Sequence, residues 1–268
     1  MSGARRISSL TLRNSRKPRS LAEARGEGQG ARFTPGERRL IRRLRTPVEV
    51  QRWLNSLPYN TEPPPGRATL RSFRGVVRHH TAHCLEAALA AAVILEPHGY
   101  PPLVVSFESI DELDHVIFVY RQKGRWGSVA RSRDPGLHGR KPVFATPRAL
   151  AASYLDTYVD LTGGVKAYTV VDLRVLGEYD WRVSEHNVWK VERMLLDTPH
   201  TPLRMSDARF RRFRKRYRAF KENYPGRKPI EYEGTSRWTE IPREFLRPLP
   251  APASTGRLSR DRNRGWAW

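Results

Sequence analysis

Three residue types that can together perform acyl transfer lie in the middle of the chain: Cys84, His115 and Asp134. Cys84 begins an apolar run that predicts a buried helix, and the unpaired N–H groups at a helix N-terminus stabilise a thiolate. A thiolate becomes an effective nucleophile when a histidine carries protons and a third group orients that histidine. The sequence therefore predicts that Cys84 attacks a carbonyl carbon, His115 transfers the proton and Asp134 orients His115.

Each of these residues also has a purely structural interpretation. A single cysteine in an apolar helix is most often a small buried hydrophobic side chain. His115 would then be a hydrogen-bonded histidine of the core, and Asp134, which precedes Pro135-Gly136, would begin a turn. The alternative prediction is a non-catalytic binding protein on the same fold.

The histidines next to Cys84 allow a metal site as a further alternative. A zinc ion could be held by His80, His83 or Cys84 together with His115. The sequence contains neither a second cysteine nor an HExxH motif to support such a site. We therefore predict that the protein uses no metal and no organic cofactor.

Two strands must place His115 and Asp134 on one face of a sheet. Strand-like runs cover 103–107, 115–121 and 126–132, and a two-residue turn at Lys123-Gly124 joins the last two. Continued along both strands, this register sets His115 opposite Ser132, with Asp134 as its diagonal neighbour on the same face. A register shifted by one residue would put Asp134 on the other face.

Helices are expected on both sides of these strands. Helical patterns begin at Thr34-Pro35, Thr46-Pro47 and Thr146-Pro147, because proline is favoured in a first turn. The segment Cys84–Leu95 is apolar almost all round, so we expect a helix buried on most sides, with Thr81 as its N-cap. The prediction is an α+β fold in which a buried central helix packs on an antiparallel sheet, with flanking helices and basic tails.

The order of the three residues resembles the transglutaminase-like superfamily of papain-type cysteine hydrolases and acyltransferases. In that family, cysteine begins a central helix, histidine lies on a following strand and Asp or Asn on the next. The matching segments are TAHCLEAA (81–88), LDHVIFVY (113–120) and WGSVARSRD (126–134). The resemblance covers 79–135 and, more loosely, 46–183. It implies acyl transfer or hydrolysis of a peptide, protein or other amide, as in a peptidase, deamidase or transglutaminase.

The segment around Cys84 departs from the family pattern. His83 and Leu85 flank the cysteine, whereas an aromatic residue often stands next to it in the family. For the oxyanion, the sequence suggests the Cys84 backbone N–H as one donor and Asn60 as a candidate side chain.

The net charge of +22 comes from the two ends of the chain. Residues 79–183 hold 11 basic and 12 acidic side chains, whereas 1–45 hold 13 and 3, and 184–268 hold 20 and 10. A basic excess suggests an anionic partner, although 41 of the 49 basic residues are arginine, a bias that genome composition also produces. We predict at most weak contact of the basic ends with nucleic acid or acidic protein.

Aromatic residues recur every three or four positions in the predicted helix 206–224. Such a stripe is first a sign of packing against a core, and we prefer this interpretation to an aromatic platform for nucleic-acid bases. The basic residues would then cover the solvated face of the helix.

Several classes of protein are excluded or disfavoured. The single cysteine excludes internal disulfides and multi-cysteine zinc modules. The longest apolar run, 87–95, is too short to span a bilayer, and no secretory signal pattern follows the basic start, so we expect a cytoplasmic protein. The predicted organisation is a disordered basic tail (1–36), a transglutaminase-like domain (37–183), a basic aromatic helical region packing on it (184–225) and a mostly irregular tail (226–268).

Overall fold

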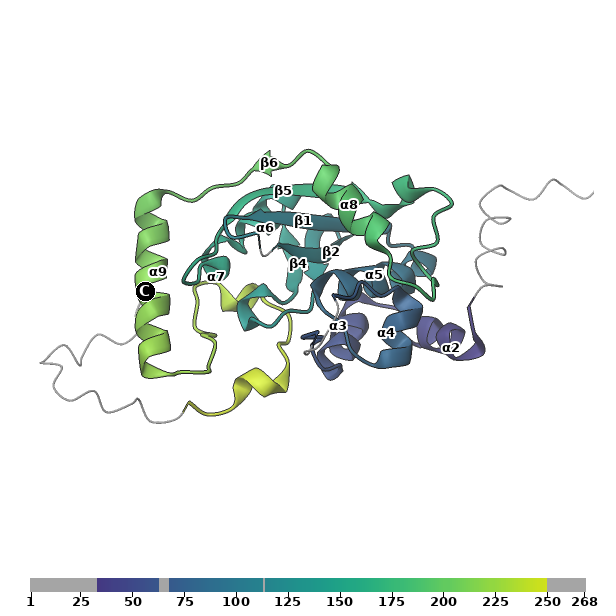
Figure 1. The fold of residues 1–268 in the computed structure, drawn as a ribbon, viewed down its shortest axis with the longest axis horizontal. Coiled ribbons are helices and arrows are strands. Elements are labelled where there is room, and N and C mark those ends of the chain that lie inside the picture. The colour runs from purple at the N-terminus through teal and green to yellow at the C-terminus, as the bar shows by residue number, and fades with distance from the viewer. Residues whose placement is uncertain (1–32, 63–67, 113, 250–268) are drawn as a thin grey trace, which may run out of the picture.

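The protein is built around one antiparallel sheet (Figure 1). A computed structural model describes residues 33–62, 68–112 and 114–249. The six strands lie in the order β4-β3-β2-β1-β5-β6. Their bounds are β1 Leu103–Ser109, β2 His115–Gln122, β3 Arg125–Val129, β4 Arg140–Phe144, β5 Val165–Asp172 and β6 Thr201–Pro202. The sheet and its helices confirm the α+β fold class, while the tails predicted for 1–32 and 250–268 lie outside the described residues.

Both faces of the sheet are covered, because alternate residues of the central strands enter two different cores. Val104 and Phe118 pack in the first core, whose helices are α2 Pro35–Arg43, α3 Pro47–Ser56, α4 Phe73–His79, α5 Cys84–Leu95 and α8 Trp189–Asp197. Val105 and Ile117 pack in the second core with two short helices, α6 Pro147–Ala152 and α7 Leu155–Tyr158. The helical pattern that begins at Thr146-Pro147 thus forms two short helices.

The predicted central helix is α5, and it begins and ends where the apolar run does. Every residue after Cys84 is buried, and the helix packs against β2 and α4. Its N-cap is His83, so the prediction of Thr81 is wrong. The Thr81 hydroxyl instead donates to the Pro58 carbonyl oxygen at 3.0 Å, which ties the segment before α5 to the end of α3.

The predicted hairpin register is confirmed, but β3 ends earlier than expected. Gln122 pairs with Arg125 and Phe118 with Val129, after which the ladder stops. There the side-chain amide of Gln51 on α3 takes the place of a neighbouring strand: it donates to the Ala130 carbonyl at 2.8 Å and accepts the Ala130 N–H at 3.0 Å. His115 therefore has no strand partner at Ser132, which removes the reason for placing Asp134 beside it.

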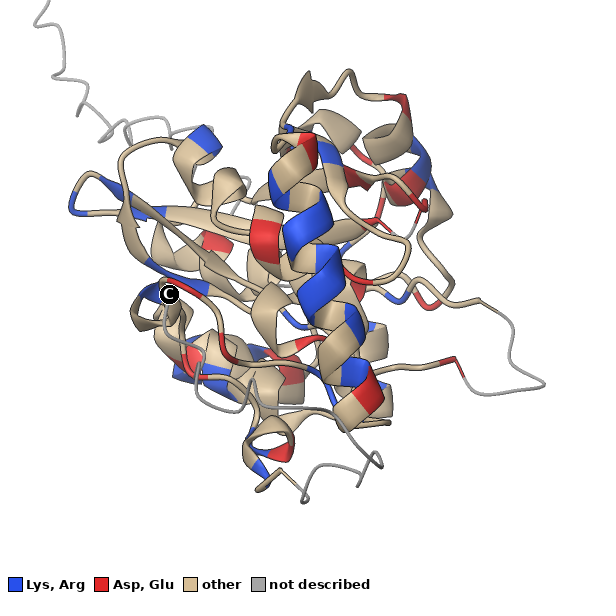
Figure 2. Ribbon diagram, turned by 90° about the vertical axis from the view of Figure 1, so that its left-hand side faces the viewer, with Lys and Arg blue, Asp and Glu red and all other residues tan. Residues whose placement is uncertain are grey.

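The chain after the sheet packs back onto the body. Helix α9, Asp207–Asn223, is capped by Ser206, and Phe213, Tyr217 and Phe220 of its aromatic stripe are buried. The stripe therefore packs against the body, and the ribbon of this helix in Figure 2 is blue, for Lys and Arg, over much of its length. The segment 224–249 then returns to the sheet, where it is anchored by Trp238, whose backbone bridges to Arg140.

Two further observations bear on the predicted organisation. Helix α2 begins at Pro35 after the N-cap Thr34, and the Phe33 ring contacts Phe73, so residues 33–36 take part in the fold. Among the described residues, the helices are all too short or too polar to cross a bilayer.

Because α5 is enclosed by both helices and sheet, a substitution that leaves a cavity beside it should lower the free energy of unfolding. Leu89→Ala removes a side chain with no exposed surface, and we expect the free energy of unfolding to fall by about 2–5 kcal/mol in urea titration. The matched control is Leu196→Ala on α8, whose side chain is 63% exposed and should change stability by less than about 0.5 kcal/mol. Equal losses for the two variants would contradict this account of the core.

Candidate active site

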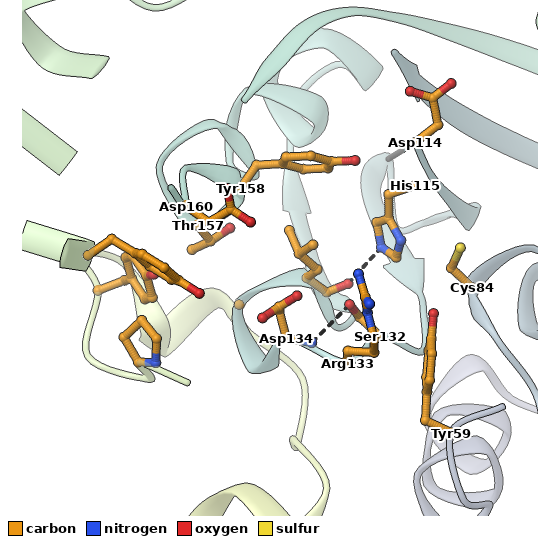
Figure 3. Close-up of a pocket in the computed structure, with 15 residues that line it drawn as sticks. Tyr59, Cys84, Asp114, His115, Ser132, Arg133, Asp134, Thr157, Tyr158 and Asp160 are labelled. Carbon is orange, nitrogen blue, oxygen red and sulfur yellow. Dashed lines mark hydrogen bonds between the residues drawn. The ribbon is translucent and has the colours of Figure 1, made fainter. Parts of the chain in front are cut away.

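A small pocket opens at the N-terminal end of α5, and Cys84, His115 and Asp134 all line it (Figure 3). Its volume is about 70 Å³. The walls come from α5, the start of β2, the loop after β3, α7, α9 and the returning segment 224–249. The fold thus brings the three residues predicted from the sequence to one cavity, although their mutual contacts differ from those expected.

Cys84 is the first residue of α5, and its thiol lies beside the His115 ring. The cysteine is partly exposed to the pocket. Burial raises the pKa of the thiol, but hydrogen bonds to His115 and His83 and the charges of these rings outweigh burial and hold the pKa well below its usual range. A lowered pKa favours the thiolate form of Cys84, which is the reactive form of a cysteine.

The His115 ring is fixed by the loop that follows β3. Its Nε2 is 2.9 Å from the main-chain carbonyl oxygen of Leu137, and its plane stacks on Phe107 with centroids 6.3 Å apart. Because a carbonyl oxygen only accepts hydrogen bonds, Nε2 carries the proton and Nδ1 is left for the thiol. The orienting group of His115 is therefore the Leu137 carbonyl, which sequence analysis did not predict.

Asp134 lies in the pocket but binds elsewhere. Its carboxylate pairs with Lys228 at 2.7 Å, and its N–H donates to the Ser132 hydroxyl. Burial lowers the pKa of Lys228, but the charge of Asp134, the hydrogen bond to it and the contact with Tyr217 together outweigh burial and raise the pKa. Since the ladder ends at Val129, Asp134 occupies a loop rather than the predicted strand position, and its contact with His115 stays a prediction.

The loop that carries Leu137 is held by a buried arginine. Arg140 donates to the carbonyl oxygens of His138 at 2.7 Å and Gly136 at 2.6 Å, and its guanidinium lies 4.0 Å from the centroid of the Tyr154 ring. Burial lowers the pKa of Arg140 to about 10. These donors fix the backbone on both sides of Leu137, and thereby the direction of the carbonyl that holds His115.

Tyr59 is a pocket residue that the sequence did not point to. A parallel bridge to Ala82 lays it along the start of α5, and its phenol oxygen accepts a hydrogen bond from the Cys84 backbone N–H. Burial and the Cys84 charge raise the pKa of the phenol, so it remains a neutral donor. The candidate Asn60 instead donates to Thr69 at 2.8 Å and to Glu86 at 3.1 Å, and it is not among the residues that line the pocket.

The outer wall of the pocket comes from distant parts of the sequence. Tyr217 of α9 and Pro229 and Tyr232 of the returning segment line it. This segment is fastened to the body by an ion pair between Glu244 and the buried Arg131 at 2.7 Å and by a bond from Lys141 to the Ser236 carbonyl at 2.8 Å. Because these residues cover the pocket from outside, its volume is small.

The described residues hold no group of three or more His, Cys, Asp and Glu side chains arranged to bind a metal ion. His83 and Cys84, which the sequence offered as alternative zinc ligands, contact one another and Thr69 instead.

Comparison with known proteins gives only a distant structural likeness. No family model and no curated protein matches the chain. Among solved structures, Legionella pneumophila LapG is similar at 13% sequence identity, over 60% of this chain and 94% of that chain, with a TM-score of 0.34. Its calcium-bound form gives 14% identity, 65% and 99% coverage and a TM-score of 0.32. A likeness this low carries no argument about the reaction.

The low pKa of Cys84 can be measured directly, because it is the only cysteine. The rate of iodoacetamide labelling follows the thiolate fraction, so we expect the native protein to label rapidly at neutral pH and to slow only as the pH falls through the depressed pKa. The control is the urea-unfolded chain, whose labelling rate should have its pH midpoint at about 8.5. A native midpoint at or above that of the unfolded chain would contradict the site as described.

Proposed function

We propose that the protein is a cysteine-dependent enzyme that transfers or hydrolyses acyl groups of a peptide, protein or other amide, in the manner of the transglutaminase-like superfamily. The observation that carries this proposal is the pairing of a partly exposed Cys84, whose pKa is lowered, with an oriented His115 in one pocket. No metal or organic cofactor is required for this chemistry.

The reaction would proceed in two balanced steps. The Cys84 sulfur attacks the carbonyl carbon, the bond to the leaving amine breaks, and the amine takes a proton from His115 Nδ1, which has first taken that proton from solvent. Water or an acceptor amine then attacks the thioester and gives its proton to His115, and the thiolate leaves. The oxyanion would be stabilised by the Cys84 N–H, which now donates to Tyr59, and by the Tyr59 hydroxyl.

Asp134 stays in the proposal as the carboxylate of the pocket. It is paired with Lys228, and the Leu137 carbonyl already orients His115. We infer that Asp134 supports the pocket through its charge and through the Lys228 pair, which ties the returning segment 224–249 to the loop after β3.

An acyl-transfer assay separates these roles. With p-nitrophenyl acetate we expect a burst of nitrophenolate from acylation of Cys84, followed by slow turnover. Cys84→Ala and His115→Ala should each lower the rate by about a thousandfold or more, because the two groups act as a unit. Asp134→Asn should lose much less, since His115 keeps its carbonyl partner.

The variants also state what would contradict the proposal. If Cys84→Ala turned over the ester as fast as the wild type, the catalytic assignment would fall. If Asp134→Asn lowered the rate as much as His115→Ala does, Asp134 would be the group that orients His115.

The outer face of α9 supports a second candidate function, the binding of an anionic partner. Arg211, Lys215 and Arg218 are exposed on this helix. We expect a DNA duplex to be retarded at low salt, with affinity that falls steeply as salt rises and does not depend on sequence. The double variant Arg211→Ser with Arg218→Ser should weaken the retardation, whereas Arg121→Ser at the end of β2 should not. Absence of retardation at low salt would remove this candidate.

A further inference from the structure

The residue that precedes the nucleophile, His83, has no role in the reaction proposed above. Its side chain is only 17% exposed, and its Nε2 lies 2.9 Å from the Thr69 carbonyl oxygen. Because that oxygen only accepts, Nε2 carries a proton. The ring also makes a hydrogen bond to the Cys84 side chain, so the thiol lies between two imidazoles, His83 and His115.

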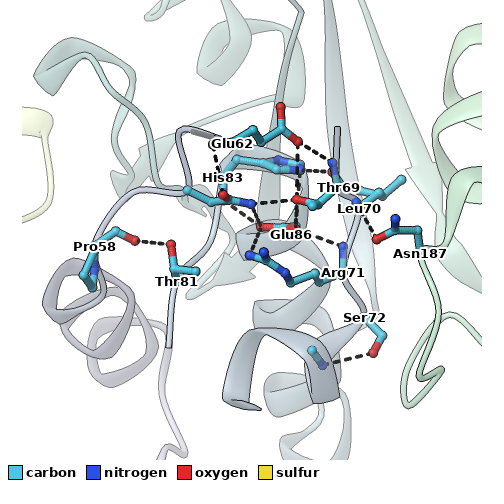
Figure 4. A network of polar contacts seen from close by, with 12 residues as sticks. Pro58, Glu62, Thr69, Leu70, Arg71, Ser72, Thr81, His83, Glu86 and Asn187 are labelled. Atoms are coloured by element: carbon cyan, nitrogen blue, oxygen red, sulfur yellow. Dashed lines mark hydrogen bonds and ion pairs between the residues drawn. The ribbon is translucent and has the colours of Figure 1, made fainter. Parts of the chain in front are cut away.

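A buried carboxylate holds His83 in this position (Figure 4). Glu86 has no exposed surface, and its Oε2 accepts the His83 backbone N–H at 3.0 Å and the Asn60 amide at 3.1 Å. Its Oε1 accepts the Thr69 hydroxyl at 3.1 Å and the Arg71 N–H at 2.9 Å, and it lies 3.7 Å from His83 Nε2. Four donors compensate the burial of a negative charge that faces the imidazole.

The electrostatic balance favours a charged His83. Burial lowers the pKa of the ring, but the hydrogen bond to Cys84, the charges of Cys84 and Glu86 and the Thr69 carbonyl together raise it to about 9. Near neutral pH the ring is therefore a cation next to the sulfur. The titratable and charged groups around this pair are Tyr59, Glu62, Arg71, Glu86, His115 and Tyr158.

We propose that His83, fixed by Thr69 and Glu86, stabilises the Cys84 thiolate before substrate binds and is a positioning residue for the nucleophile. The inference rests on the proposed function and deepens it. The proton of the thiol moves from Sγ to His83 Nδ1, the sulfur keeps both electrons of the broken bond, and the net charge of the pair is unchanged.

In a simple cysteine–histidine pair, one histidine both stabilises the thiolate and transfers protons. Here His83 and His115 each perform one of these two roles. His83 is held by a carbonyl and a carboxylate that do not line the pocket, so it remains an imidazolium throughout. His115 lies in the pocket and is left to exchange protons with the leaving amine and the acceptor. The thiolate consequently keeps one of its two stabilising imidazoles when His115 gives up its proton.

The test compares the pH dependence of iodoacetamide labelling in single variants of the full chain. His83→Gln should raise the apparent pKa of Cys84 by about one unit or more, which is about tenfold slower labelling below the pKa. His83→Lys, which keeps a cation, should recover part of this shift. His79→Gln, an exposed histidine at the end of α4, is the matched control and should change nothing.

His115→Ala gives an independent measurement that does not need a folded His83 variant. Its thiol should keep a pKa below that of the unfolded chain, because His83 remains, while its ester turnover is lost. The inference is overturned if His115→Ala returns the thiol to the unfolded value, or if His83→Gln leaves the labelling profile unchanged. If the wild type shows no burst with p-nitrophenyl acetate while the labelling shifts hold, the proposed function fails and the role of His83 at the thiolate stands.

Discussion

The complete burial of α5 is the constraint on which the rest of the structure depends. A twelve-residue helix that is apolar almost all round, with Glu86 as its one charged residue, cannot rest on a sheet alone, so α2, α3, α4 and α8 must close over the faces that the sheet leaves open. Of this helix only Cys84 lines the pocket, and the residues just before it, Thr81 and Ala82, are hydrogen-bonded to Pro58 and Asn60 at the end of α3. The same enclosure that hides eleven residues therefore exposes Cys84 at a fixed place.

The polar groups at this helix end form two separate systems. On one side, Glu86, Thr69 and His83 make a buried network behind the sulfur. On the other, the Leu137 carbonyl fixes His115 in the pocket, and Arg140 shapes the loop that supplies this carbonyl. A strongly basic protein thus uses one of its arginines as an internal scaffold, with main-chain oxygens and an aromatic ring in place of a counter-ion.

Local patterns predicted the parts of the fold that depend on local interactions. The bounds of α5 and the register of the β2–β3 hairpin follow from apolar periodicity and turn chemistry, and both predictions are confirmed. The end of β3 could not be predicted, because it is set by Gln51, a side chain 79 positions away. For the same reason the positions of Tyr59 and Leu137 had no signal: one depends on a bridge to Ala82, the other on a loop folded around Arg140.

The wall that covers the pocket is made late in the synthesis of the chain. Cys84, His115 and Leu137 leave the ribosome well before Tyr217, Pro229 and Tyr232 are made, and the fastening of the wall involves Ser236 and Glu244. Until these residues are made, the chain lacks the wall that narrows the cavity around Cys84. The residues that limit the size of what can reach the sulfur are therefore the last part of the pocket to be made.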